Sequence, residues 1–437
     1  MKVLIISAAF PPMRAGDAEH ALQLCMHLAS RGADVHLVTT KGHSAPEPVS
    51  FHVHAAMKSW SWSNAPTLIN VLKKIQPDVV LLIYSAWMYQ SHPMITFAPT
   101  IVKRVLGKVP FVTQLEIIKE ENAQQSLTTR AIRKFVKYGV SSVGVDYWMG
   151  TLYRDSDRLI VLSEHHLSQL SVLMPDVASK TEVIPPPPLI PMCADAQTAR
   201  AQGRARLALD QDHFLLAYFG YIDITKGVET LLQAIKLVAA QAGNVRLVMI
   251  GGGRGTTKTT LDQRGKFIVS YERNMMLLSE RLGIADKVTW LQGYSSGSLE
   301  ASMYLYAADV CVLPFDRGVI LSRSSLGAAA AHGLPIITTR GEHLESPFQD
   351  RKNIFLCPPK DPEELAAAIS SIMKNPKLRQ DLSNGAYQLA EDWFSWDKAM
   401  ARTIGALTDS PGFVPSTIHK LGMAQSTNGE NIHRSES

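Results

Sequence analysis

The chain has 437 residues, of which 46% are hydrophobic and 19% charged, and its formal net charge is +5 at pH 7. This length exceeds one compact core, so we expect two α/β domains of ordinary size. The mild charge excludes the dense basic surface of a nucleic-acid-binding protein, and the longest apolar stretch, residues 79–89, is too short to span a bilayer.

The cysteines and the first residues indicate a cytoplasmic protein. The four cysteines lie far apart without CxxC spacing, which is typical of reduced, mostly buried thiols: Cys25, Cys193, Cys311 and Cys357. The apolar start could belong to a signal peptide. However, it ends in Pro11-Pro12 and a helical pattern follows at once, so we expect none.

The first half of the chain predicts a doubly wound domain. An apolar run over residues 2–8 has the length of a buried strand, and helical spacing follows over residues 17–31. Gly32 ends that helix, and residues 34–40 form the next strand. Such a strand–helix–strand unit requires a right-handed crossover and a parallel sheet. Further strands are predicted at residues 79–83, 111–113 and 158–162.

Four consecutive prolines, residues 185–188, predict a stiff, extended connector, after which the pattern restarts. A helix is predicted at residues 227–241, and strands at residues 213–219, 245–250, 286–291, 310–313 and 334–338. We therefore predict domains over residues 1–190 and 191–393, a final helix at 394–407 and a disordered polar tail over 408–437. Two such domains leave a cleft between their strand carboxyl ends, where open parallel sheets bind ligands.

The N-terminal stretch FPPMRAGDAEH places Gly16 in the loop between the first strand and the first helix. A glycine there lets a ligand approach the backbone, and the helix N-terminus favours phosphate. The alternative interpretation is an ordinary connecting loop.

A stronger signal is FGYIDITKGVETLLQAI, where a strand ends at Gly220 and Lys226-Gly227 opens a helix. A lysine at this point can reach a diphosphate held over the helix N-terminus. Neutralising a nucleoside diphosphate leaving group is the main electrostatic need of sugar transfer from an activated donor. The alternative is a solvated lysine at a helix start.

The glycines of MIGGGRGTTKTT follow the next predicted strand. The spacing GxGxxG is absent and no GK[ST] closes a Walker loop, so this motif supports neither a dinucleotide site nor an ATPase site. We expect Gly251, Gly252 and Gly253 to form a loop on the cleft wall. The polar segment that follows, up to residue 274, is predicted to be a surface excursion.

The stretch LPFDRGVILSRSSLGAAAAHGLPIITT predicts a strand, a charged loop and a helix of small residues. Arg323 could supply a second, bidentate phosphate clamp, and Ser324 and Ser325 suit a helix N-cap or a phosphate contact. The alternative for Arg323 is a surface arginine.

We expect no metal site, because the chain has no HExxH motif and no Cys/His cluster, and His165-His166 are adjacent on a predicted helix and so point apart. Another helical pattern interleaves Ile132, Phe135 and Val136 with Arg130, Arg133, Lys134 and Lys137. Such a basic amphipathic helix is either a solvated surface or a point of peripheral membrane contact, at the inner face for a cytoplasmic protein.

Taken together, these stretches resemble glycosyltransferase family 4 over residues 1–407: the N-terminal loop and helix, the FGY…TKGVETLLQAI unit, and ADVCVLPF…AAAAHGLPIITT. The resemblance implies the GT-B fold, with two Rossmann-like, doubly wound domains facing a central cleft. It also implies a nucleotide-sugar donor held mainly by the C-terminal domain, and a final helix crossing back to the N-terminal one. It further implies retention of anomeric configuration without a metal, and it assigns diphosphate binding to Lys226.

The chain departs from the family pattern at several positions. Gly16 matches the first of two N-terminal glycines, but the second is Asp17, and Tyr221 replaces the arginine of the second motif. The family has two glutamates separated by seven residues. Counted from the helix, the second falls on Ala328; counted from Pro314, the first falls on Gly318, and the gap is then two residues too long, so neither carboxylate is present. We hypothesise that Arg323 partly replaces the missing arginine. The histidine expected after the VT strand end is also absent, which leaves Glu116 in VTQLE as the nearest polar side chain.

We therefore expect a glycosyltransferase that moves a sugar to a sugar, lipid or polysaccharide acceptor and needs no cofactor. The expected catalytic side chains are Lys226, Arg323 and Glu116. The expected donor contacts are Gly16, Gly220, Tyr221, Lys226, Gly227, Gly251, Gly252, Ser324 and Ser325, and the acceptor contacts are Asp17, Glu19 and His20. An inverting enzyme would need Glu116, Glu19 or Asp17 as its base. The alternatives are a non-catalytic GT-B scaffold, suggested by the lost glutamates, and a nucleotide-sugar epimerase.

Overall fold

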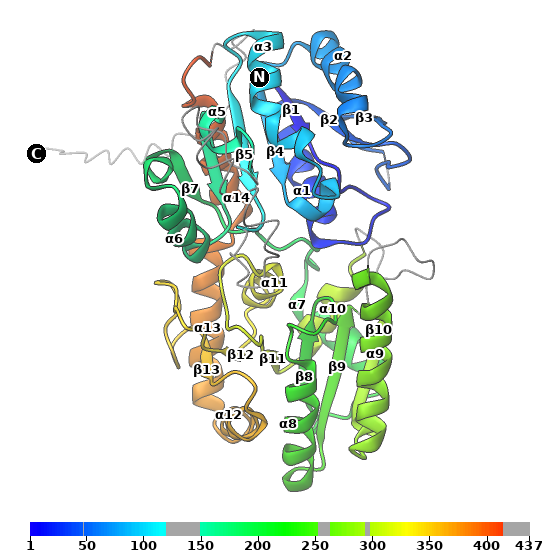
Figure 1. The fold of residues 1–437 in the computed structure, drawn as a ribbon. Coiled ribbons are helices and arrows are strands. Elements are labelled where there is room, and N and C mark those ends of the chain that lie inside the picture. Colours follow the sequence, from blue (N-terminus) through cyan, green and yellow to red (C-terminus); the bar gives the residue numbers. More distant parts are fainter. Residues whose placement is uncertain (47, 119–148, 252–262, 293–297, 414–437) are drawn as a thin grey trace, which may run out of the picture.

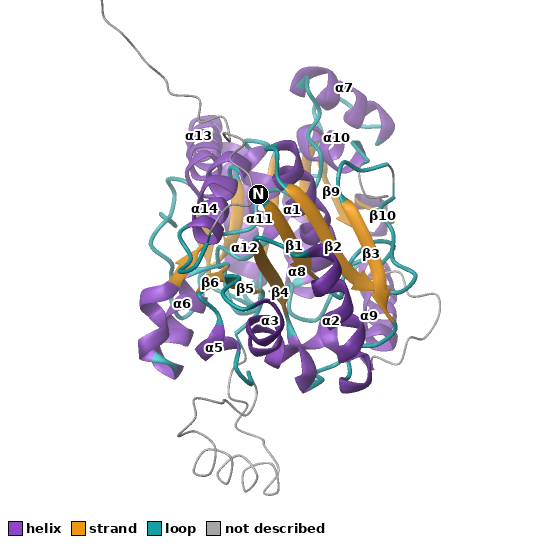
Figure 2. Ribbon diagram, turned by 90° about the horizontal axis from the view of Figure 1, so that it is seen from above, coloured by secondary structure: helices purple, strands orange, loops and turns teal. Residues whose placement is uncertain are grey.

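The computed structural model describes residues 1–46, 48–118, 149–251, 263–292 and 298–413. Two α/β domains lie one above the other along the long axis of the molecule (Figure 1). Each is a parallel sheet with helices on both faces, as Figure 2 shows from above. The predicted fold class, two Rossmann-like domains, is confirmed.

Within the described residues, the N-terminal domain has a seven-stranded sheet in the order β3-β2-β1-β4-β5-β6-β7. The strands are β1 (Lys2–Ile6), β2 (Asp34–Thr40), β3 (His52–Met57), β4 (Val79–Tyr84), β5 (Phe111–Leu115), β6 (Arg158–Val161) and β7 (Thr181–Val183). Its helices are α1 (Gly16–Ser30), α2 (Ala65–Ile75), α3 (Ala98–Leu106), α5 (Leu152–Asp155) and α6 (Glu164–Leu173). The central strand β4 reads VVLLIY and is buried throughout, because helices cover both faces of a parallel sheet.

The C-terminal domain repeats this plan with six strands in the order β10-β9-β8-β11-β12-β13 among the described residues. They are β8 (Phe214–Phe219), β9 (Val245–Gly251), β10 (Val288–Gln292), β11 (Val310–Leu313), β12 (Ile336–Thr339) and β13 (Phe355–Cys357). The helices are α7 (Ala196–Arg206), α8 (Val228–Gln241), α9 (Gln263–Arg281), α10 (Glu300–Ala307), α11 (Ser324–Ala331), α12 (Pro362–Lys374) and α13 (Pro376–Trp393).

The last helix, α14 (Trp396–Thr408), leaves the C-terminal domain and packs on the other one. Met400 and Leu407 are buried in the N-terminal core, whereas Leu389 of α13 belongs to the C-terminal core. Trp396 stacks on His27 of α1 with ring centroids 3.9 Å apart. The chain therefore joins the domains twice, once through the buried prolines 185–188 and once between α13 and α14.

Several expectations need correction. Residues 263–274, predicted to be a surface excursion, belong to helix α9. The tail does not begin at residue 408, since Thr408 ends α14, Ser410 is buried and Phe413 packs against the N-terminal core. The edge strands β3, β7 and β13 were not predicted, because they are short or carry polar residues. None of the described helices has the length and apolar character needed to cross a membrane.

Candidate active site

In each sheet, the strand order reverses at one point, between β1 and β4 and between β8 and β11. Loops that leave such a pair of strands diverge and create a crevice at the carboxyl edge of the sheet. In the C-terminal domain these loops are residues 220–227 and 314–323. They contain Lys226 and Arg323, the two cations predicted to contact a diphosphate.

The two loops are packed directly on each other. Gly227 precedes α8 with φ of +66°, and a Cβ at this position would lie 1.8 Å from the carbonyl oxygen of Pro314. The amide of Asp316 donates a hydrogen bond to the carbonyl of Thr225 (3.1 Å). Gly227 was predicted to be the first residue of the helix. It instead precedes the helix, and its lack of a side chain lets the loop with Lys226 pack against the loop with Pro314.

The ends of β8 and β9 also meet through glycines. Gly220 and Gly251 have φ of +127° and +131°, and a Cβ on Gly251 would lie 2.6 Å from the Gly220 carbonyl oxygen. The hydroxyl of Tyr218 donates to the carbonyl of Tyr221 (2.9 Å), which fixes the loop after β8. These predicted donor residues thus line the switch point, whereas Gly252 lies outside the described residues.

Lys226 and Arg323 both lie against the aromatic ring of Phe315. The Lys226 Nζ lies 5.2 Å, and the Arg323 Cζ 5.1 Å, from the centroid of the buried Phe315 ring. The Arg323 Nε is buried and has no hydrogen-bond partner among the described residues. Burial lowers the pKa of the Arg323 guanidinium, an effect that Asp223 opposes. This partly buried cation is poised to accept an anionic partner.

Helix α11 begins at Ser324 and Arg323 is its N-cap residue, so the N-terminal amide groups of the helix follow directly on Arg323. Ser324 and Ser325 are its first residues, and the Arg323 side chain makes no capping hydrogen bond. Ala328, where the family's second glutamate falls, is fully buried in the core. At Gly318, where the first falls, a Cβ would lie 2.1 Å from the amide nitrogen of Gly341. Neither position presents a carboxylate to the crevice.

The N-terminal domain contributes a buried ion pair. His20 of α1 and Glu116, directly after β5, lie 3.3 Å apart between His20 Nδ1 and Glu116 Oε1. Gln114 Nε2 donates to the same carboxylate oxygen (2.6 Å). Burial lowers the pKa of His20, but the Glu116 carboxylate and, less strongly, Asp17 more than compensate, so that the pKa is raised. When the ring is protonated, its Nδ1 donates to Glu116, and Gln114 Nε2 also approaches Nδ1 (3.4 Å).

The other predicted acceptor residues lie in the first turn of α1. Asp17 and Glu19 are partly buried there. Gly16 is the first residue of the helix, and a Cβ built on it would meet nothing within 4 Å. This glycine therefore opens space in front of the helix N-terminus, in contrast to the tightly packed Gly227.

His166 of α6 lies within electrostatic range of both halves of the site. Burial lowers its pKa to about 4, and the smaller influences on that pKa include Glu116 of the N-terminal domain and Arg323 of the C-terminal domain. The ring is therefore neutral at pH 7. Its Nδ1 is buried without a hydrogen-bond partner in the described structure. The predicted catalytic groups of the two domains thus face a common region.

Two glutamates hold the domains together at the start of α6. Buried Glu345 accepts hydrogen bonds from the amide of His165 (2.7 Å) and from the amide of Leu321. Glu164 in turn accepts from the amide (2.7 Å) and the hydroxyl (2.5 Å) of Ser346. These bonds connect α6 of the N-terminal domain to loops of the C-terminal domain, and so they fix the position of α6 relative to Leu321 and Ser346.

Sequence reasoning missed three of these side chains: Gln114, His166 and Glu345. Each follows or ends a predicted element at a sheet's carboxyl edge or a helix start, which is the available signal. The positions of His166 and Glu345 depend on the contact between the domains, and that of Gln114 on how α1 packs beside β5, which no local pattern encodes.

The His20–Glu116 pair makes stability depend on pH. Folding raises the pKa of His20, so the pair stabilises the fold fully below about pH 6.5 and this contribution is lost as the pH rises through the folded-state pKa. We expect His20→Gln to cost about 3 kcal/mol at pH 6, because Glu116 remains buried without its cation, and less at pH 9. Urea unfolding of both proteins across this range measures the difference. Glu116→Gln should make the free energy of unfolding less dependent on pH. If the cost of His20→Gln did not change with pH, the prediction would be contradicted.

Sequence models of known families match both halves of the chain. The model described as Glycosyltransferase Family 4 matches residues 15–187, and that of Glycosyl transferases group 1 matches residues 200–389. The D-inositol 3-phosphate glycosyltransferase of Saccharomonospora viridis is 28% identical over 260 residues, which is 58% of this chain and 55% of that protein. That of Mycolicibacterium gilvum is 31% identical over 43% of this chain and 40% of its own length. The chain thus spans about half the length of these curated relatives.

Solved structures share the fold. Sucrose-phosphate synthase from Thermosynechococcus elongatus superposes with a TM-score of 0.67 at 18% identity, covering 92% of this chain and 97% of its own. Anabaena HepE, solved in complex with UDP and glucose, gives a TM-score of 0.66 at 14% identity and covers 94% and 100%. The two family models follow the order of the two domains, and the paired parallel sheets are those of the GT-B fold. This chain belongs to the family 4 type glycosyltransferases.

Proposed function

We propose that this enzyme moves a hexosyl group from a nucleoside diphosphate sugar to a hydroxyl group of a sugar, lipid or polysaccharide acceptor, with retention of configuration. The observation that carries the donor assignment is the partly buried Arg323 side chain, whose buried Nε lacks a hydrogen-bond partner among the described residues. A buried charge with an unpaired donor is costly, so the site is suited to an anion that the substrate supplies.

The diphosphate would lie between Lys226, Arg323 and the N-terminus of α11. Arg323 would bind it with two parallel donors, Lys226 would act as a point charge, and the helix amides would add their dipole. Because negative charge grows on the diphosphate as the sugar leaves, these contacts strengthen in the transition state and so accelerate the reaction. Gly220 and Gly251 would let the nucleotide approach the backbone.

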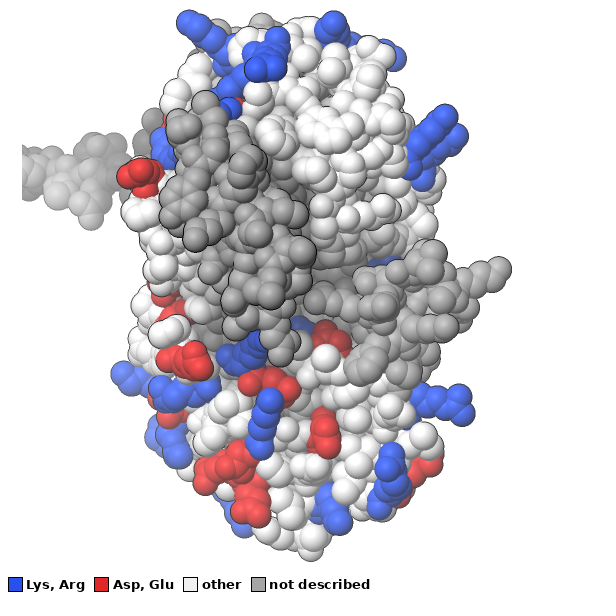
Figure 3. Space-filling view, viewed as in Figure 1, with Lys and Arg blue, Asp and Glu red and all other residues white. Residues whose placement is uncertain are grey.

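The comparisons support these substrate classes. The structure of HepE in complex with UDP and glucose supports a nucleotide-sugar donor. The names of the curated relatives, D-inositol 3-phosphate glycosyltransferases, support a hydroxyl group as acceptor. On the face drawn in Figure 3, Lys and Arg mix with Asp and Glu on the C-terminal domain, whereas the described surface of the N-terminal domain is uncharged at its centre, with Lys and Arg at its rim. Such a surface suits a sugar or lipid better than a nucleic acid.

Retention fits the state of Glu116. Its carboxylate is buried, lies 3.3 Å from His20 and accepts a hydrogen bond from Gln114, so it is poorly placed to act as the free base of an inverting reaction. We infer that the bond from the sugar C1 to the diphosphate oxygen breaks while the acceptor oxygen bonds to C1 on the same face. The acceptor proton passes to the departing phosphate oxygen. The His20–Glu116 pair would then orient the acceptor instead of removing its proton.

We also propose that the donor site works without a metal or other cofactor, because Lys226 and Arg323 can supply the charge that a divalent cation would provide. The basic segment with Arg130 and Lys137 lies outside the described residues. Peripheral membrane contact and a cytoplasmic location stay predictions.

Calorimetric titration with UDP, GDP, ADP and their sugars tests the donor assignment. We expect one nucleotide to bind saturably, and Lys226→Ala to weaken it roughly tenfold, as expected for one charge-assisted hydrogen bond. Lys236→Ala is the matched control, because Lys236 lies exposed on the following helix, α8, and should leave binding unchanged. If a folded wild-type protein binds none of these nucleotides, the proposed donor site is wrong.

A further inference from the structure

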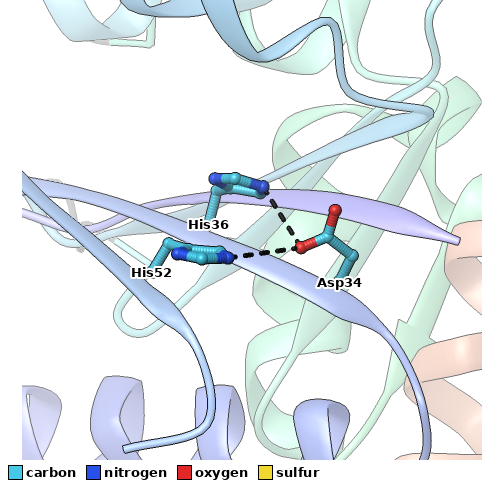
Figure 4. Close-up of side chains that lie close together, drawn as sticks. All are labelled: Asp34, His36 and His52. Carbon is cyan, nitrogen blue, oxygen red and sulfur yellow. Dashed lines mark ion pairs between the residues drawn. The ribbon is translucent and has the colours of Figure 1, made fainter.

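Four polar side chains gather at the amino ends of β2 and β3, at the outer end of the N-terminal domain. Asp34 and His36 are two residues apart on β2, as His52 and His54 are on β3. The two side chains of each pair therefore project from the same face of their strand. The parallel register places His36 opposite His52. Figure 4 shows Asp34, His36 and His52 with the two imidazoles beside each other and the carboxylate at their edge. Sequence spacing did not reveal this group, because strand register creates it.

The distances suit a shared metal ion. His36 Nε2 lies 3.2 Å, and His52 Nε2 3.9 Å, from the Asp34 carboxylate oxygen Oδ1, and one ligand atom from each residue falls within 4.8 Å of the others. Tetrahedral coordination with bonds of about 2.0–2.2 Å separates ligand atoms by roughly 3.3 Å. The His36–Asp34 distance already has this value. The exposed His52 ring stacks on His36 with centroids 4.7 Å apart, so it would have to turn out of this stack to direct its lone pair at the same ion.

His54 is placed to select the tautomer of His36. The Nδ1 of His36 lies 2.9 Å from the Nε2 of His54. When His36 donates its Nδ1 proton to His54, its Nε2 carries a free lone pair directed at the site, which is the usual arrangement around a metal-bound histidine.

We propose that Asp34, His36 and His52 form a binding site for a divalent transition metal of the zinc class, with His54 as the residue that positions His36. Imidazole and carboxylate ligands together favour Zn²⁺, Ni²⁺ or Cu²⁺ over Mg²⁺ or Ca²⁺. A water molecule would take the fourth position, since the Asp34 and His52 side chains are exposed.

The location indicates a role apart from sugar transfer. The amide of Asp34 donates to the carbonyl of Met1, so the cluster lies at the amino edge of the sheet, whereas the candidate active site lies at the carboxyl edge. In Figure 1 the N-terminus is at the end of the molecule farthest from the C-terminal domain. Strand β3 lies at the edge of the described sheet and pairs there with β2. A metal here would cross-link these two strands and so stabilise that edge.

The test uses the full chain, free of any histidine tag and stripped with a chelator, titrated with ZnCl₂ and, separately, with MgCl₂. We expect one Zn²⁺ per chain, a raised melting temperature and no Mg²⁺ binding. His36→Gln and His52→Gln should weaken Zn²⁺ binding at least 100-fold, and His54→Gln about tenfold. Replacing Zn²⁺ with Co²⁺ should give the visible absorption of tetrahedral cobalt, which His36→Gln removes.

His213→Gln is the matched control, because His213 belongs to the second geometric group of this kind, with Asp210 and Asp212. This substitution should leave Zn²⁺ binding unchanged, because the group around His213 consists of one histidine and two exposed acidic residues. Melting temperatures in chelator verify that each variant is folded. Absence of binding to the wild type, or equal binding by folded His36→Gln, would overturn the proposal. Binding lost only in His213→Gln would do the same.

Discussion

Replacing Arg323 with methionine should weaken nucleoside diphosphate binding about 100-fold while leaving the protein folded. The loss corresponds to about 2.7 kcal/mol, the expected contribution of a bidentate, charge-assisted contact in a buried site. Methionine retains the apolar stem that packs near Phe315, but it removes every donor. Calorimetric titration with the nucleotide that the wild type binds measures the change.

The stability of this variant separates a binding role from a structural one. Removing a partly buried guanidinium relieves its desolvation cost but forfeits its contact with Phe315, so we expect the free energy of unfolding to change by less than about 1 kcal/mol. Arg323→Lys restores the charge without the planar fork and should lose only about tenfold in affinity. A large drop in stability with unchanged nucleotide affinity would show that Arg323 is a structural residue.

A double-mutant cycle with Lys226 adds a further criterion. Both cations lie near the Phe315 ring and would contact the same diphosphate, so their effects should not be additive. Purely additive losses would indicate that the two residues bind different groups.

The main elements of the fold could be predicted because buried parallel strands read as continuous apolar runs. The strand predicted over residues 79–83 is observed as β4 (Val79–Tyr84), and that over 310–313 as β11. Strand β3 was missed because it lies at a sheet edge and carries His52 and His54, so it lacks the apolar run. Helix α9 was missed because its sequence is largely polar, so apolar residues do not recur at a clear helical spacing.

The candidate site could be predicted only as far as local motifs reach. Lys226 and Arg323 follow strands in chain order, so their loops could be placed at the carboxyl edge. Glu345 could not, because its carboxylate lies in a loop that touches the other domain's helix α6. The buried state of the His20–Glu116 pair depends likewise on how α1 packs against β5, which a sequence pattern does not specify.

Gly227→Ala should lower the free energy of unfolding by at least about 3 kcal/mol and abolish nucleotide binding. The left-handed backbone at φ of +66° costs a residue with a Cβ roughly 1–2 kcal/mol. The Cβ would also lie 1.8 Å from the Pro314 carbonyl oxygen, so backbone must move. Because the displaced loop leads to Phe315 and Arg323, the cations would lose their common position. The melting temperature should fall by about 6–12 °C for a domain of this size.

Gly243→Ala provides the matched control. Gly243 follows the same helix α8, has no positive φ, and a Cβ there would meet nothing within 4 Å, so its free energy of unfolding should change by no more than about 0.5 kcal/mol. Thermal unfolding and nucleotide titration of both variants test the packing of the two loops. If Gly227→Ala melts and binds like the wild type, the contact between the Lys226 loop and Pro314 does not organise the donor site, and the lysine must be held by other means.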